Sequence, residues 1–589
     1  MSEMKTVAEH VVDFLVRREI KHVFGLCGHT NIAVLSAMAN SQIEFVTVRH
    51  EQVASHAADA YARVNGKASV VLSHLGPGLT NCATGVANAA FDCIPMVVIA
   101  GDVPTHYYGK HPHQEVNLHA DAQQYEIYRP FVKRAWRVDR ADLIAEILEK
   151  AFHLAESGQP GPVLINVPMD VFSEVISSDT FDRIKNNTRA LIKPSIDEAT
   201  SELIIENLVN ANHPVVYAGG GVLLARASEE LAALADHLQI PIAHSLMGKG
   251  VVSDQNPLVL GMTGFWGTEL VNQTCLKADW IFAVGTRFKE ADCSSWYPGY
   301  TFNIPGSKVI HIDIEASEIG RNYPTEIGVV ADAKAALQTL LNTAKRLYPE
   351  GKPASPILKK IESSREEFQA SNHAMAKSDA FPMMPERILA DTRRAMPEDV
   401  IITTDVGWNK NGVGQQFDIL TPGSILTPGG FATMGFGPPA AIGAKLAAGD
   451  KIVLSLVGDG GFGQNPSLLA TAVELNLSII WLIMNNNAFG TIAGLQKAHY
   501  GLTYGTTFPG DAKTPEHGPD YAALARSYGA KGIKIGSANE LLPALEEAIK
   551  NGGPTVIDVP MINNPTPTTG HWNILDIYSP DKDVSHVAT

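Results

Sequence analysis

Residues 458–487 read GDGGFGQNPSLLATAVELNLSIIWLIMNNN, and this stretch decides the fold. The GDG follows the apolar run KIVLSLV (451–457), and the asparagines follow the apolar run IIWLIM (479–484). Such runs, separated by a helical pattern, predict strands of a parallel sheet, and ligands bind outside the carboxyl ends of such strands. At these ends, the carboxylate of Asp459 and the amide of Asn486 suit an octahedral Mg²⁺ that bridges two phosphates. Glycines there let backbone N–H groups approach a diphosphate.

The bulk composition indicates a large, well-packed enzyme. The 589 residues predict about three to four domains. The hydrophobic content of 45% and the charged content of 18% are typical of an ordered globular chain. The formal net charge is −16, and the sequence has no long basic run, so nucleic acid and anionic membranes are not expected partners.

Cysteine usage and the N-terminus predict a cytoplasmic protein. Five scattered cysteines argue against a disulfide framework and for a reducing compartment. Residues 1–20 are expected to form an amphipathic helix rather than a signal peptide, since they contain no uninterrupted apolar core. No apolar run reaches the length of a membrane span.

Short apolar strands alternate with helical patterns throughout, which predicts an α/β fold with three doubly wound parallel-sheet domains. We expect these domains at residues 1–185, 195–345 and 381–565, followed by a C-terminal tail at 566–589. Two polar segments, 169–194 and 348–382, are expected to be linkers.

Further motifs extend the pattern over nearly the whole chain. They are VRHEQVASHAADAYAR (48–63), LGPGLTN (75–81), HPHQEV (111–116), YAGGGV (217–222), LGMTGFWGT (260–268), HIDIEASEIGRN (311–322) and GGFATMGFGPPAAIGAKLA (429–447). With the GDG–NN stretch, they resemble the thiamine-diphosphate-dependent enzymes of the acetohydroxyacid (acetolactate) synthase-like family. The resemblance implies a pyrimidine-binding, a central and a diphosphate-binding domain.

The resemblance assigns the metal and diphosphate ligands. It implies that Mg²⁺ is held by Asp459, Asn486 and the backbone carbonyl of Ala488. The diphosphate would lie against the backbone of Gly458, Gly460, Gly461, Phe489 and Gly490.

Three residues are expected to act on the aminopyrimidine of the cofactor. Glu51 resembles the glutamate that bonds a ring nitrogen and drives formation of the imino tautomer, which removes the thiazolium C2 proton. Met434 occupies the place of the bulky apolar residue that keeps the cofactor bent, although a methionine is more often a core residue. The carbonyl of Ala432, where many relatives have glycine, would accept a hydrogen bond from the cofactor amino group.

Histidines that follow predicted strands are candidates for proton transfer near neutral pH. His29 in GLCGHTN resembles a histidine of cyclohexane-1,2-dione hydrolase. His74 in LSHLGPG aligns with a histidine that benzoylformate decarboxylase and the dione hydrolase use. Gln114 matches the active-site glutamine of the synthases. Two roles stay open for the other three, which either bind a substrate carboxylate or are surface loop residues: His111, His113 and His119.

The chain departs from the synthases at the second-substrate site. Their RFDDR is RFKEA here, with Ala291 in place of the second arginine, and Leu495 stands where they have a tryptophan. Both changes make acetolactate doubtful as the physiological product and leave room for a different acceptor.

The middle block resembles the region that holds FAD in the synthases and ADP or nothing in other relatives, so FAD stays an open alternative with a structural role. Gly219, Gly220 and Gly221 follow a predicted strand and allow close approach to a phosphate. Asp313 is placed to meet a ribose, and Asp332 lies near the end of the block.

Together these features predict a thiamine-diphosphate- and Mg²⁺-dependent decarboxylase or carboligase acting on a 2-oxo acid or related carbonyl compound. One alternative is a C–C hydrolase or lyase of the cyclic-dione type, and another is a non-catalytic nucleotide-binding relative. By resemblance, Glu51 and the diphosphate loop of one site come from different subunits, which implies a homodimer or homotetramer.

Overall fold

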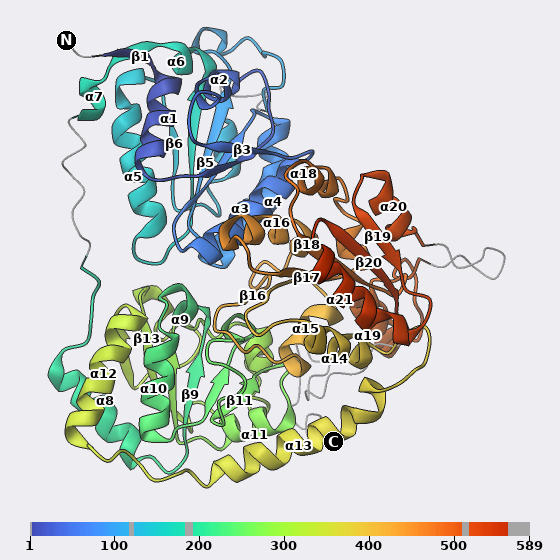
Figure 1. The fold of residues 1–589 in the computed structure, drawn as a ribbon. Coiled ribbons are helices and arrows are strands. Elements are labelled where there is room, and N and C mark those ends of the chain that lie inside the picture. Colours follow the sequence, from blue (N-terminus) through green and yellow to red (C-terminus); the bar gives the residue numbers. More distant parts are fainter. Residues whose placement is uncertain (1–2, 117–122, 183–191, 509–517, 564–589) are drawn as a thin grey trace.

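A computed structural model describes residues 3–116, 123–182, 192–508 and 518–563. It contains three six-stranded parallel sheets with flanking helices, which confirms the predicted α/β class with three sheet domains (Figure 1). The predicted tail at 566–589 lies outside the described residues. No helix among the described residues is long and apolar enough to cross a membrane.

The N-terminal sheet has the strand order β3-β2-β4-β5-β7-β6. Its strands are β2 (His22–Gly25), β3 (Glu44–Thr47), β4 (Ser69–Ser73), β5 (Met96–Asp102), β6 (Ala135–Arg137) and β7 (Pro162–Pro168). Its helices are α1 (Val7–Arg17), α2 (Ile32–Met38), α3 (Glu51–Asn65), α4 (Pro77–Phe91) and α5 (Ile144–Glu156). Helix α1 begins at a capping box in which Thr6 and Glu9 satisfy each other's backbone N–H groups.

The described part of the segment expected as the first linker contains secondary structure. It contains α6 (Met169–Ser173), β8 (Val175–Ser177) and α7 (Asp179–Asp182), and β8 pairs with β1 (Met4–Thr6) in an antiparallel ribbon.

The central sheet has the order β11-β10-β9-β12-β13-β14. Its strands are β9 (Pro214–Ala218), β10 (Ile242–His244), β11 (Val259–Met262), β12 (Trp280–Val284), β13 (Lys308–Asp313) and β14 (Ile327–Val330). Its helices are α8 (Glu198–Asn210), α9 (Gly220–Leu224), α10 (Ser228–Leu238), α11 (Glu269–Leu276) and α12 (Ala333–Leu347).

The C-terminal sheet has the order β16-β15-β17-β18-β20-β19. Its strands are β15 (Ile401–Thr404), β16 (Ile425–Leu426), β17 (Val453–Gly458), β18 (Ile479–Asn485), β19 (Lys531–Lys534) and β20 (Thr555–Pro560). Its helices are α14 (Pro385–Ala395), α15 (Trp408–Gln416), α16 (Gly437–Ala448), α17 (Asp459–Phe462), α18 (Leu468–Glu474), α19 (Gly490–Tyr500), α20 (Tyr521–Ser527) and α21 (Leu541–Asn551).

Helices α3 and α16 join the N-terminal and C-terminal domains (Figure 1). Both are rich in alanine, and their buried alanines belong to one apolar core that spans the two domains. A Cβ atom on Gly443 would lie 1.7 Å from the carbonyl oxygen of Ala57, so the two backbones touch there. The close contact fixes where α3, and hence Glu51 at its first turn, lies relative to the C-terminal sheet.

The second expected linker contains a helix that the sequence analysis missed. Helix α13 (Ile357–Ala376) is twenty residues long and runs along the edge of the molecule between the central and C-terminal domains (Figure 1). Of its side chains only Ile361 is buried. Its Lys, Glu and Gln residues favour a helix, but without an apolar face they give no periodic signal.

Candidate active site

The ends of two neighbouring strands bring the three expected metal ligands together. Strand β17 pairs in parallel with β18, and Gly458 lies opposite Met484. One end of the Asn486 amide lies 3.0 Å from the carbonyl oxygen of Ala488 and 3.1 Å from Oδ1 of Asp459. With its nitrogen there, the amide donates to both oxygens. With its oxygen there, three oxygens face one another, and this donor set fits a hard cation such as Mg²⁺.

Asp459 is held in a buried position at the first residue of α17. It is 2% exposed, and the Tyr521 hydroxyl donates to its backbone carbonyl at 3.1 Å. Burial raises the pKa of the Asp459 carboxyl to about 6, although nearby backbone N–H groups oppose the shift. A cation bound to its oxygens favours the carboxylate and offsets the cost of burial.

Two of the glycines beside these ligands, Gly460 and Gly490, have little room for a side chain. A Cβ on Gly460 would lie 2.9 Å from the ring of Phe489, and one on Gly490 would lie 2.6 Å from Nδ2 of Asn486. Packing against Phe489 and Asn486 thus explains these two glycines, and they leave the backbone without side chains where the diphosphate cradle is expected.

The residues from Thr427 to Gly437, which we call the Met434 loop, connect β16 to α16 and run beside this cradle. Met434 reaches the GDG turn, since its Cε would lie 3.4 Å from a Cβ on Gly460. Ala432 has a φ of 51°. This left-handed conformation costs an alanine about 1–2 kcal/mol, and strain of this kind clusters at functional sites.

Asp405, which the sequence analysis did not single out, anchors the end of the Met434 loop. It follows β15, and its carboxylate accepts from the N–H groups of Gly435 at 3.1 Å and Gly437 at 2.9 Å. Burial raises the pKa of Asp405 to about 6, against these N–H donors. The available signal was its position: an acidic residue directly after a buried strand, in TTDVG.

Glu51 lies apart from the metal ligands within this chain. It begins α3, is 6% exposed, and its Oε2 accepts from Nδ2 of Asn81 at 3.0 Å. Among the described residues, its carboxylate makes no hydrogen bond to the Met434 loop or to the metal ligands. Gly78 separates it from His74, because a Cβ there would meet Glu51 Oε1 at 3.4 Å and His74 Cβ at 3.1 Å.

The structure brings His29, His74 and Gln114 together beside Glu51. The His29 and His74 rings meet edge to face, with centroids 4.7 Å apart. Nε2 of His74 lies 2.9 Å from Oε1 of Gln114. Burial, and then the neighbouring imidazoles of His74 and His113, lower the pKa of His29. A neutral imidazole such as that of His29 can accept a proton.

Thr30 completes this group and was also missed. Its hydroxyl lies 2.7 Å from Nδ1 of His74 and accepts from the N–H of Leu75 at 3.4 Å. A Cβ on Gly28 would lie 2.3 Å from Cγ of His74, so the GHT turn wraps the ring closely. The threonine directly after His29 in that turn was the only available sequence signal.

Of the other three candidate histidines, His113 contacts the group around His29 and His111 does not in the described ring contacts. His113 stacks on His29 with centroids 6.3 Å apart and is exposed. His111 is an exposed loop residue with a φ of 52°. His119 lies outside the described residues.

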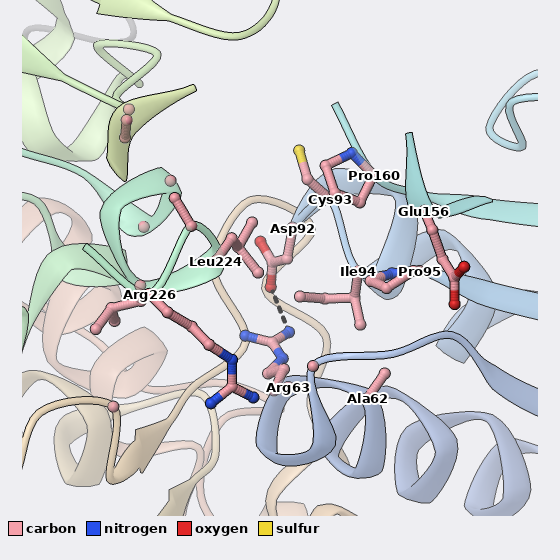
Figure 2. Close-up of a pocket in the computed structure, with 18 of the residues that line it drawn as sticks. Ala62, Arg63, Asp92, Cys93, Ile94, Pro95, Glu156, Pro160, Leu224 and Arg226 are labelled. Carbon is pink, nitrogen blue, oxygen red and sulfur yellow. Dashed lines mark hydrogen bonds and ion pairs between the residues drawn. The ribbon is translucent and has the colours of Figure 1, made fainter. Parts of the chain in front are cut away.

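A cavity of about 1700 Å³ lies where the three domains meet. Figure 2 shows part of its wall, with Arg63, Asp92 and Cys93 from the N-terminal domain and Arg226 from the central domain. Asp313 and Asp332 also line it. Burial raises the pKa of Asp313 to about 6, and Asp332 pairs with Lys193 at 2.8 Å and caps α12.

The glycines of YAGGGV are explained by packing against the protein itself. The N–H groups of Gly219 and Gly221 donate to the carbonyls of Val284 and Gly285. A Cβ on Gly219 would lie 2.1 Å from the Gly285 carbonyl oxygen. The volume of the cavity and its mixed polar and apolar lining fit a dinucleotide, but these two glycines do not point N–H groups at one.

Lys289 belongs to RFKEA (287–291), one of the two segments that depart from the synthase pattern. It lies in the wall of this cavity, with Nζ 3.7 Å from Oδ1 of Asp92. Leu495 lies half-buried on α19, the helix that follows the metal ligands. Neither residue contacts the metal ligands directly in the described hydrogen bonds and ion pairs.

Three family models match the chain in the order of its three sheets. They are the N-terminal TPP binding domain of thiamine pyrophosphate enzymes at residues 5–123, the central domain at 202–340 and the C-terminal TPP binding domain at 405–559.

Curated relatives cover most of the chain. It is 34% identical to a probable acetolactate synthase large subunit of Methanocaldococcus jannaschii, over 94% of this chain and 91% of that protein. It is 35% identical to the corresponding protein of Methanococcus aeolicus, with the same coverage. It is 31% identical to the acetolactate synthase isozyme 3 large subunit of Escherichia coli, over 93% of both chains.

Proposed function

This chain belongs to the thiamine pyrophosphate enzyme family and is acetolactate synthase-like, and we propose that it joins two carbonyl compounds, with a 2-oxo acid as donor. The predicted family, a thiamine-diphosphate-dependent enzyme that is acetolactate synthase-like, is confirmed by the matched models and relatives. These matches do not favour the hydrolase or the non-catalytic alternative.

The observation that carries the proposal is the convergence of Asp459, Asn486 and the Ala488 carbonyl at the ends of β17 and β18. In our proposal these oxygens hold Mg²⁺, and the backbone at Gly458, Gly460, Gly461, Phe489 and Gly490 holds the diphosphate. When bound, thiamine diphosphate supplies the carbanion that attacks a carbonyl and the electron sink for C–C cleavage.

The chain's own residues control protons and orientation. Glu51, kept from water by burial, holds the proton at the aminopyrimidine nitrogen, and Ala432 offers its carbonyl to the amino group. Met434 supports the bend between the two rings. His74 donates its Nε2 proton to the substrate oxygen or returns it, while His29 and Gln114 orient the same oxygen. The donor loses its carboxylate before the second carbonyl is joined.

The acceptor is proposed to differ from that of the synthases, because Ala291 and Leu495 replace an arginine and a tryptophan. A small apolar Leu495 supplies no indole N–H and leaves a wider, less polar space. Small aldehydes and 2-oxo compounds are therefore the acceptors to test.

We place FAD in the cavity between the three domains, with a structural role. The pocket's size supports this, and Asp313 is the group proposed to meet a ribose. Flavin absorbance of the purified protein, before and after denaturation, measures its content directly. The catalytic unit is proposed to be a homodimer, which can pair into a tetramer.

Cofactor titration and product analysis test this function. Wild-type protein should bind thiamine diphosphate only with Mg²⁺ present, and Asp459→Ala should lose about 10²-fold or more in affinity. NMR of mixtures of 2-oxo acids and aldehydes should then show carbon dioxide release coupled to a new hydroxyketone. No binding of thiamine diphosphate with Mg²⁺ by folded wild-type protein would overturn the proposal.

A further inference from the structure

The start of the Met434 loop is held by a carboxylate from a different domain. Asp92 follows α4 of the N-terminal domain, and its side chain is fully buried. Oδ2 accepts from the N–H of Gly429 at 2.9 Å, and Oδ1 accepts from the N–H of Gly430 at 2.7 Å. Each carboxylate oxygen therefore accepts a hydrogen bond from one of two consecutive residues, and the second of these, Gly430, lies two residues before Ala432.

Arg63 braces this contact from helix α3. Its Nη2 lies 3.0 Å from Oδ2 of Asp92, its Nε lies 2.6 Å from Oδ1 of Asp59, and its Nη1 donates to the carbonyl of Thr427 at 3.1 Å. Figure 2 shows the Arg63–Asp92 pair in the cavity wall. One guanidinium thus binds the carboxylate that holds the loop and the first residue of the loop itself.

The charge of Asp92 is secured by its surroundings. Burial opposes ionisation, but Arg63, Lys289 and the two glycine N–H groups together hold the pKa of Asp92 below its usual value. Asp92 is thus a carboxylate at neutral pH, and a carboxylate can accept two parallel N–H groups where an amide cannot.

We propose that Asp92, braced by Arg63, is a positioning residue that sets the Met434 loop for the cofactor. The loop is fixed at both ends by carboxylates, Asp92 before Ala432 and Asp405 after Met434. Between these anchors Ala432 keeps its left-handed backbone, which decides where its carbonyl points. The inference rests on the proposed cofactor site, since the loop has this role only if it contacts the aminopyrimidine.

The alternative is that Asp92 only ties the two domains together. In that case its loss should lower stability and leave cofactor binding and C2 exchange unchanged. The chain offers a matched control, because Arg49 and Glu474 form another ion pair between the same two domains, and in the described residues no hydrogen bond or ion pair joins Glu474, at the end of α18, to the loop. Glu474→Gln removes an inter-domain ion pair without touching the Met434 loop.

The test compares Asp92→Asn, Arg63→Lys and Glu474→Gln with wild type in the full-length chain. Three quantities are measured: the melting temperature, the Kd for thiamine diphosphate with Mg²⁺, and the rate of deuterium exchange at C2 of the bound cofactor. Asparagine keeps the shape of Asp92 but turns an NH₂ group toward one glycine N–H. We expect C2 exchange to slow by about 10²-fold and the Kd to rise, as for a displacement of about 1 Å near the reacting centre.

Arg63→Lys keeps the charge but replaces three separate donor nitrogens by one, which cannot reach Asp59, Asp92 and Thr427 from their three directions, so it should shift both cofactor measurements in the same direction by less. Glu474→Gln should leave both within two-fold of wild type. The inference is overturned if Asp92→Asn lowers the melting temperature while C2 exchange and Kd stay at wild-type values. If Asp92→Asn does not fold, Arg63→Lys decides by the same two readouts. Wild-type protein that neither binds the cofactor nor exchanges C2 contradicts the proposed function instead.

Discussion

At the scale of single residues, Thr30 makes the sharpest prediction. Its hydroxyl bridges the N–H of Leu75 and Nδ1 of His74, and donating to Nδ1 leaves the proton of a neutral His74 on Nε2. Thr30→Val keeps the shape but leaves the buried Nδ1 unpaired, at a cost of about 1–3 kcal/mol. We expect kcat to fall by roughly ten-fold and the pH profile of kcat to shift.

Thr30→Ser is the control for this prediction. It retains the hydroxyl and should recover most of the activity and the wild-type profile. If Thr30→Val and Thr30→Ser behave alike in steady-state kinetics across pH, the hydroxyl does not decide which ring nitrogen of His74 carries the proton.

Asp405 predicts a pH effect on stability. Its pKa of about 6 in the folded protein lies above the ordinary value of 3.8, because the carboxyl is buried. The folded state therefore binds this proton more tightly than the unfolded state. As pH rises from about 4 to about 6, the contribution of Asp405 to the free energy of unfolding should fall by up to about 3 kcal/mol. Above pH 6 it should stay constant.

Denaturant unfolding of wild type and Asp405→Asn, each measured from pH 4 to pH 8, isolates the contribution of Asp405 to the free energy of unfolding. The stability of wild type relative to the variant should decline through the window from pH 4 to pH 6 and then level off. A flat difference across that window would contradict the raised pKa.

At the scale of elements, helix α3 connects two functional regions. Glu51 lies in its first turn and Arg63 in its last, and the middle of the helix packs on α16 through Gly443. Gly443→Ala places a methyl group 1.7 Å from the Ala57 carbonyl oxygen, so the helices must separate. We expect a loss of about 1–3 kcal/mol in the free energy of unfolding.

Gly161→Ala is a suitable control, because its new methyl group would meet only the flexible side chain of Lys133, at 3.2 Å. Chemical unfolding of both variants should show a large loss only for Gly443→Ala. Equal stability of the two would mean that the α3–α16 contact adapts without strain.

The elements also show how far the sequence could be read. Buried strands such as β17 and β18 are apolar runs bounded by glycine or asparagine, so these strands and the GDG–NN residues at their carboxyl ends could be predicted. The predicted role of these residues remains to be tested. Helix α13 could not be found, since it has no apolar stripe. Asp92 could not be found either, because its partners are backbone N–H groups brought close only by the tertiary fold, and for Asp405 the sequence shows only its position directly after a buried strand.

At the scale of the whole molecule, the candidate site residues form two separate groups. One contains Glu51, His74 and Gln114 in the N-terminal domain, and the other contains the metal ligands and Met434 in the C-terminal domain. Resemblance predicts that each group meets its complement on a second subunit. Sedimentation and light scattering should then show a homodimer or a homotetramer.

Mixed dimers test the composite site directly. Glu51→Gln and Asp459→Asn should each be nearly inactive alone, losing roughly 10²–10⁴-fold for the lost proton transfer in the first case. If each site combines Glu51 of one subunit with Asp459 of the other, a mixed dimer holds one doubly altered site and one wild-type site. Random assembly after co-expression should thus restore about one quarter of wild-type activity. Sites built within one chain give no restoration, and two differently tagged chains purified in sequence would show that mixed dimers had formed.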